Sequence, residues 1–148
     1  GGTLSTAETV VAAQKDVTLL QEARLGTKIE ISDISAPVDG LMNFSISNIG
    51  TTSITDLEHM DIMLYDSTNG YSTYKYVKNL AVPPENLDPN SLADYTWTDV
   101  IYSNDNIHSR QLDPGTTMIV EVKLPSSAER PTTLQVITGN GISAISII

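Results

Sequence analysis

The spacing of apolar positions changes once along the chain, from every third or fourth residue to every second residue. The first pattern covers residues 1–26, where its apolar positions are Val10, Ala13, Val17 and Leu20. On a helix of about 3.6 residues per turn these positions form one narrow stripe. Ser5, with Glu8 three residues later, has the pattern of a capping box, which starts a helix. The sequence therefore predicts an N-terminal amphipathic helix.

The apolar stripe of this helix needs a partner surface, and the sequence leaves two kinds of partner open. The stripe packs against the chain's own sheet or a second copy of the chain. Alternatively, the helix continues a longer one whose preceding part lies in a membrane or in a filament core.

The second pattern covers residues 27–148, where apolar and polar residues alternate and Gly, Pro, Asn and Asp recur at short intervals. The clearest strand runs from Met118 to Leu124, and a glycine-rich turn at 139–141 joins the last two strands. Residues 78–94 include three prolines and are predicted to form the longest loop. About seven or eight short strands with this turn spacing indicate an all-β fold, an immunoglobulin-like sandwich of two antiparallel sheets.

Composition then narrows the possible partners. A chain of 148 residues fits one sandwich domain preceded by a helix. Its net charge of -10 repels nucleic-acid phosphates, so a nucleic-acid partner is not expected. The absence of cysteine excludes disulfides and thiolate metal sites, so packing and sheet hydrogen bonds must stabilise the fold.

The sequence predicts no catalytic, cofactor or metal site. It has no cysteine nucleophile and no G-x-S-x-G segment. The two histidines, His59 and His108, lie far apart and match no zinc-binding pattern. The turn Asp66–Gly70 lacks the acidic alternation and final glutamate of a calcium-binding EF-hand. We therefore predict a non-enzymatic binding module, with a carbohydrate- or calcium-binding sandwich as an alternative.

Aromatic residues of the predicted strands are the candidates for a protein contact. They are Tyr74, Tyr76, Trp97 and Tyr102. Aromatic rings bury a large area at low entropic cost, so they are common at protein interfaces. Tyrosine also suits a strand without any binding role, and that interpretation stays open.

One segment has the form of an N-glycosylation site. Asn43, Phe44 and Ser45 form an N-x-S sequon in a predicted strand. Alternation along the strand places Asn43 on the face opposite Phe44, where a glycan would reach solvent. Sequons of three residues also arise by chance.

Four sequence segments together resemble a known family. The segments are MNFSISNIG at 42–50 followed by two threonines, MDIMLYD at 60–66, LDPGTTMIVEV at 112–122 and LQVITGNGISA at 134–144. In this order they resemble the soluble domain of the archaeal flagellar (archaellum) accessory proteins FlaF and FlaG. The residues that match the turns of that family are Asn48, Gly50, Asp66, Pro114, Gly115, Asn140 and Gly141. Each suits a turn, so the match supports the fold rather than an activity.

This resemblance implies a β-sandwich outside the archaeal cell membrane, preceded upstream of Gly1 by a type-IV-pilin-like membrane helix. Family members are placed around the archaellum motor beneath the surface layer. FlaF-like proteins bind the surface-layer protein as a stator, often as homodimers, and FlaG-like proteins assemble beside them. The FlaF-like assignment is favoured, while an insertion from Tyr71 to about Tyr102 keeps the FlaG-like one open. A filament subunit, such as an archaellin or a pilin, is the alternative function.

Overall fold

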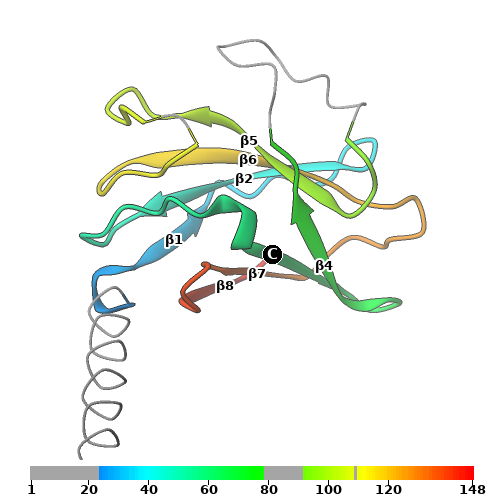
Figure 1. Ribbon diagram of the computed structural model, residues 1–148. Coiled ribbons are helices and arrows are strands. Elements are labelled where there is room, and N and C mark those ends of the chain that lie inside the picture. The colour runs from blue at the N-terminus through cyan, green and yellow to red at the C-terminus, as the bar shows by residue number, and fades with distance from the viewer. Residues whose placement is uncertain (1–23, 79–91, 109) are drawn as a thin grey trace, which may run out of the picture.

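The computed structural model describes residues 24–78, 92–108 and 110–148 (Figure 1). The predicted helix stripe, Val10, Ala13, Val17 and Leu20, lies outside the described residues, as does most of the predicted loop 78–94. Only the segment from Arg24 to Gly26 is described at the start, and it is helical. Within these described ranges, no helix is both long and apolar enough to cross a membrane.

The described residues form eight strands and one short 3₁₀ helix, η1. They are β1 (Ile29–Ser32), β2 (Leu41–Asn48), η1 (Leu57–His59), β3 (Asp61–Asp66), β4 (Gly70–Tyr76), β5 (Thr96–Tyr102), β6 (Thr117–Lys123), β7 (Thr133–Ile137) and β8 (Ser143–Ile147). The number of strands agrees with the predicted seven or eight, and β6 lies within the strand predicted from Met118 to Leu124 apart from its first residue. The all-β class is therefore confirmed.

The strands pair in the order β1-β2-β6-β5-β4-β3-β7-β8. Figure 1 shows that this sheet folds over itself into two layers, with β2, β6 and β5 above β7 and β8, and with β4 crossing between them. The two edge strands, β1 and β8, come close to each other without pairing, so the sheet nearly closes. The predicted sandwich is confirmed in that the strands form two packed layers.

The strand directions differ from the sequence-based prediction at one position. β4 and β5 pair in parallel, through Lys75 with Thr96 and Tyr76 with Trp97. Parallel neighbours need a connection of about a dozen or more residues, and the predicted long loop between these strands supplies it. The prediction of entirely antiparallel sheets is therefore wrong at this pair.

The core lies between the two layers and is built from the inward positions of the strands. Its fully buried side chains include Met42, Phe44, Ile46, Ile62, Trp97, Met118, Val120, Val122, Leu134 and Val136. Burying a large apolar side chain contributes about 1.5–3 kcal/mol, so this packing replaces the disulfides that the chain lacks.

Candidate interaction surfaces

The four aromatic residues predicted to bind a partner lie in or against the core. Trp97 is 0% exposed and Tyr74 is 2% exposed, so neither offers its ring to another protein. Tyr76 and Tyr102 are half-buried, and both hydroxyl groups donate hydrogen bonds to Asp99. The sequence-based prediction needs correction for Tyr74 and Trp97, because the strand faces that carry them turn inward.

Tyr76, Tyr102 and Asp99 form a polar cluster inside the domain. The carboxylate oxygens of Asp99 lie 2.8 Å from the Tyr76 hydroxyl and 2.6 Å from the Tyr102 hydroxyl. An irregularity in the β5–β6 register between Asp99 and Ile101 accompanies the inward position of the carboxylate. Burial raises the pKa of both tyrosines, and the nearby carboxylate raises it further. Both tyrosines therefore remain neutral donors to the buried Asp99 side chain, which is a structural role.

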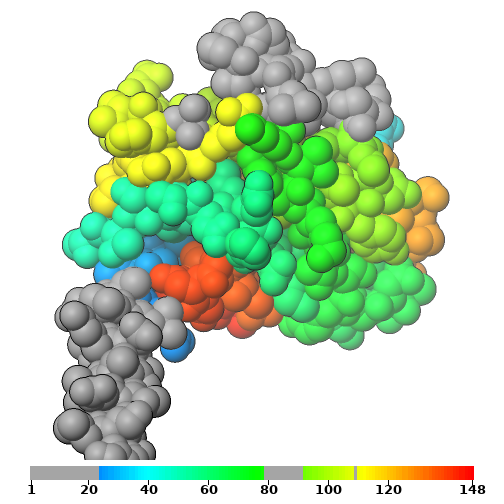
Figure 2. Space-filling view, in the orientation of Figure 1, coloured from blue at the N-terminus to red at the C-terminus, as the bar shows by residue number. Residues whose placement is uncertain are grey.

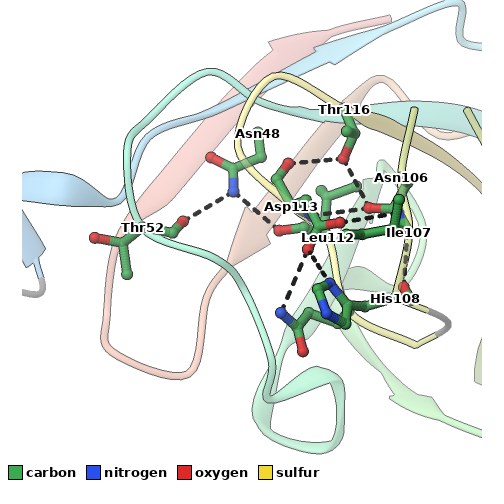
Figure 3. Close-up of polar contacts among 9 residues, drawn as sticks. Asn48, Thr52, Asn106, Ile107, His108, Leu112, Asp113 and Thr116 are labelled. Carbon is green, nitrogen blue, oxygen red and sulfur yellow. Dashed lines mark hydrogen bonds and ion pairs between the residues drawn. The ribbon is translucent and has the colours of Figure 1, made fainter.

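A second polar network joins two loops at one end of the sandwich (Figure 3). Asn48 is fully buried at the end of β2. Its side-chain nitrogen donates to the carbonyl oxygens of Thr52, at 2.9 Å, and Leu112, at 3.0 Å. Its side-chain oxygen accepts the Gly50 amide at 3.0 Å. One amide side chain thus holds the loop after β2 against the loop before β6.

The loop before β6 is itself ordered by side-chain hydrogen bonds, as Figure 3 shows. The Asp113 carboxylate accepts the Ile107 amide at 3.0 Å and contacts His108 Nδ1 at 2.9 Å. The Asn106 oxygen accepts the Asp113 amide and the Thr116 hydroxyl, both at 2.9 Å. Partial burial opposes ionisation of Asp113, but the hydrogen bonds from His108 and the Ile107 amide outweigh it and lower the pKa of that carboxyl. These contacts connect residues 106–108 to residues 113–116.

Other residues that carry the family resemblance also hold turns. Asp66 Oδ1 accepts the amides of Thr68, at 2.9 Å, and Asn69, at 2.7 Å. Gly115 and Gly141 have φ angles of 79° and 88°, in the region that favours glycine. These residues therefore hold the turns in which they lie.

A shallow cavity of about 330 Å³ lies beside the Asn48 network, between residues 52–56, residues 138–140 and Thr27. In Figure 2 the turquoise segment that contains residues 52–56 lies beside the orange-red segment that contains residues 138–140. Hydroxyl groups dominate its polar lining, with one carboxylate, Asp56, which contacts His59 Nδ1 at 2.8 Å. The hydrogen bond that the His59 ring donates to the Asp56 carboxylate, and the charge of that carboxylate, raise the pKa of His59. No group of three potential metal ligands occurs in the described part of the chain.

The outer face of the second layer carries two rows of side chains without charge. Strand register gives one row as Tyr71, Tyr65, Thr133 and Ile147, and the other as Thr73, Met63, Gln135 and Ile145. We call these eight residues the uncharged face. The most exposed apolar members are Ile147, at 78%, and Ile145, at 61%. The Tyr65 and Tyr71 rings contact each other with centroids 5.0 Å apart.

The uncharged face was not predicted from the sequence, although a signal for it exists. Side chains alternate between faces along a strand, so Tyr71 and Tyr74 must lie on opposite faces of β4. Ile145 and Ile147 likewise alternate with the inward Ala144. Selecting aromatic residues by type alone favoured Tyr74, whereas strand parity identifies Tyr71 as the exposed one.

Comparison with known proteins supports the fold. No protein-family model and no curated protein matches the chain. Among solved structures, the fold is similar to that of the archaellum periplasmic stator protein FlaG from Sulfolobus acidocaldarius, with a TM-score of 0.52 and 20% identity over 81% of this chain and 99% of that chain. The archaellum periplasmic stator complex of FlaF and FlaG from the same organism gives a TM-score of 0.49 and 19% identity over 81% of this chain and 89% of that chain.

The similarity to FlaG confirms, for the fold, the resemblance to archaellum accessory proteins that the turn motifs indicated. The favoured FlaF-like assignment stays a prediction.

Proposed function

We propose that the chain is a non-enzymatic stator or anchoring component of an archaellum, located in the archaeal cell envelope outside the cytoplasm. Its binding partner is the surface-layer protein. The observation that carries this proposal is the fold shared with the stator protein FlaG over nearly all of that protein's length. The order of the turn motifs along the chain points to the same family.

The shape of the domain suits a mechanical role. Hydrogen bonds between strands connect the sheet along its length, so a pull on one strand is shared by its neighbours. Two polar networks, centred on Asn48 and Asp99, hold loops and strands in place inside this sheet. Anchoring a rotating machine requires such a body and a binding surface, but no turnover.

The uncharged face supplies the contact through which two sandwiches pair. Because the chain carries a net charge of -10, two copies repel each other over most of their surfaces. The uncharged face carries no carboxylate and exposes apolar side chains. Repulsion between two copies is therefore weakest there, and pairing through this face would bury the most apolar surface. We assign this face to a homodimer contact, and the same geometry suits a FlaF- or FlaG-type partner.

The N-terminal residues connect this body to the membrane. In the proposed full-length protein, the helix that contains Val10, Ala13, Val17 and Leu20 continues a membrane helix upstream of Gly1. A span of about 20 apolar residues there is the expected anchor.

Cross-linking in intact cells, followed by purification of the full-length protein, tests the proposal. We expect the surface-layer protein and a FlaF- or FlaG-type protein to be recovered with it. An abundant envelope protein that does not belong to the surface layer serves as the specificity control. Electron microscopy of the purified protein tests the alternative, because regular fibres in place of discrete complexes would favour a filament subunit.

A further inference from the structure

We infer that Asn43 is an N-glycosylation site and that its glycan covers the exposed side chains of Ile119 and Ile101. This inference rests on the extracytoplasmic location proposed above. The glycan would occupy the outer face of the first layer, formed by β2, β6 and β5. The uncharged face of the second layer would then remain the surface available for protein contact.

The geometry of β2 makes Asn43 accessible. Asn43-Phe44-Ser45 is the only N-x-S/T segment, with x other than proline, in the full sequence. Phe44 is 0% exposed and points into the core, so the exposed Asn43 points outward. The backbone of Asn43 is bonded to Ser35 on both its amide and its carbonyl side. The side-chain amide has no hydrogen-bond partner among the described residues, so it is free for attachment.

A second observation indicates that something covers this face. Ile119 is 37% exposed and Ile101 is 58% exposed, and the two are paired neighbours on β6 and β5. Ser45 lies two residues along β2 from Asn43 and pairs with Ile119 on β6, and Ile101 lies one strand farther, on β5. With about 3.4 Å per residue and about 4.8 Å between strands, Ile119 is roughly 8 Å and Ile101 roughly 12 Å from Asn43. A glycan of several sugars spans that distance. Their C–H faces would then shield the two apolar side chains from water and from other molecules.

The attachment is a glycosyl transfer. The Asn43 side-chain nitrogen forms a bond to the anomeric carbon of an oligosaccharide carried on a lipid pyrophosphate. The bond between that carbon and the phosphate oxygen breaks, the lipid pyrophosphate leaves with the electron pair, and the amide proton passes to a base of the transferase. In the folded domain Ser45 is only 5% exposed and β2 is paired with β6. The transfer must therefore precede the pairing of β2.

The intact mass of the full-length protein from its native cells tests the attachment. We expect a mass above that of the polypeptide in the wild type, in Ser45→Thr, which keeps the sequon, and in Asn104→Gln, an exposed asparagine outside any sequon. Asn43→Gln is expected to lose the whole increment. Digestion with an added protease, of cells from which the surface layer has been removed, establishes on which side of the membrane the protein lies.

The inference is overturned if the wild-type protein is digested from outside yet has the polypeptide mass. An unmodified protein protected from the protease would overturn the proposed location as well, so the two failures are distinguishable. Retention of the extra mass in Asn43→Gln would also overturn the assignment to this residue.

Precipitation by ammonium sulfate tests the covering of the isoleucine pair. Asn43→Gln from native cells is expected to precipitate at a lower salt concentration than the wild type, because Ile119 and Ile101 become uncovered. Adding Ile101→Ser to that variant is expected to restore part of the solubility. Equal precipitation midpoints for the wild type and Asn43→Gln would contradict the covering.

Discussion

The carbonyl oxygen of Gly26 lies directly against the α-carbon of Gly50. A Cβ atom on Gly50 would overlap that oxygen and would lie 2.7 Å from the Lys28 amide nitrogen. The same carbonyl accepts the amides of Thr51, at 2.8 Å, and Thr52, at 3.0 Å. The loop after β2 therefore holds the chain where it enters the sandwich.

Replacing Gly50 by alanine is expected to destabilise the domain by about 1–3 kcal/mol, the usual cost of overpacking. The added Cβ forces the loop away from Gly26, which weakens the hydrogen bonds to the Gly26 carbonyl. Urea unfolding of the domain measures the loss. Thr51→Ala is the matched control in the same loop, because its side chain is exposed, and it should stay within about 0.5 kcal/mol. Equal stability of the two variants would contradict the close contact.

Asn48→Ala is expected to cost about 3 kcal/mol or more, because two carbonyl oxygens and one amide lose their buried partner. Asn48→Asp keeps an oxygen for the Gly50 amide but places negative charge beside the two carbonyl oxygens. At neutral pH it should therefore be no more stable than Asn48→Ala. The exposed Asn104→Ala is the control, and urea unfolding is the measurement. Wild-type stability in Asn48→Ala would show that the network is dispensable.

Lowering the pH is expected to destabilise the domain through Asp66. The Asn69 amide, with further hydrogen bonds from the Asn69 side chain and the Thr68 amide, lowers the pKa of this carboxyl. A carboxyl whose folded pKa is lowered contributes stability above its unfolded pKa of about 3.9, and the contribution is lost as the pH falls through the folded pKa. Asp66→Asn removes this proton linkage.

Unfolding free energies of the wild type and Asp66→Asn, measured from neutral pH to about pH 3, check this expectation. The difference between the two proteins should be largest near neutral pH and should shrink as the pH falls below about 4. Asp113 and Glu129, whose pKa values are also lowered, remain in both proteins and provide the common background. A pH-independent difference would contradict the role of the Asp66 charge.

A charge placed on the uncharged face is expected to prevent dimer formation. Tyr71→Asp puts a carboxylate beside Tyr65, where it would face the same charge of the second copy. Sedimentation equilibrium should give a dimer for the wild type and a monomer for this variant. Ile101→Asp, on the opposite outer face, is the matched control and should remain dimeric. A wild type that stays monomeric at high micromolar concentration would contradict the assigned contact, as would dissociation of the control.

Local sequence periodicity was sufficient to predict the strands. The alternation from Met118 to Leu124 encodes one buried face directly, and Gly141 allows the turn that closes the last hairpin. The parallel pairing of Tyr76 with Trp97 was not predicted, although the long connection between their strands is the feature that permits it.

The polar networks could not be predicted, because their partners are distant in sequence. Asn48 bonds to Leu112, 64 residues away, and Tyr76 bonds to Asp99, 23 residues away on the neighbouring strand. Residue type also misdirected the choice of contact residues. An exposed Tyr71 and a buried Tyr74 differ only in parity along β4, so the face of a strand, and not its aromatic content, decides which ring is available.

The most direct test of the anchoring role is the binding of the purified domain to isolated surface-layer protein. The wild-type domain is expected to bind in a saturable manner, and an unrelated acidic sandwich of similar net charge is expected not to bind. Ile101→Asp, which adds a charge on the face opposite the uncharged face, is expected to bind the surface-layer protein in the same saturable manner. No detectable association of the wild-type domain at high micromolar concentration would contradict the account.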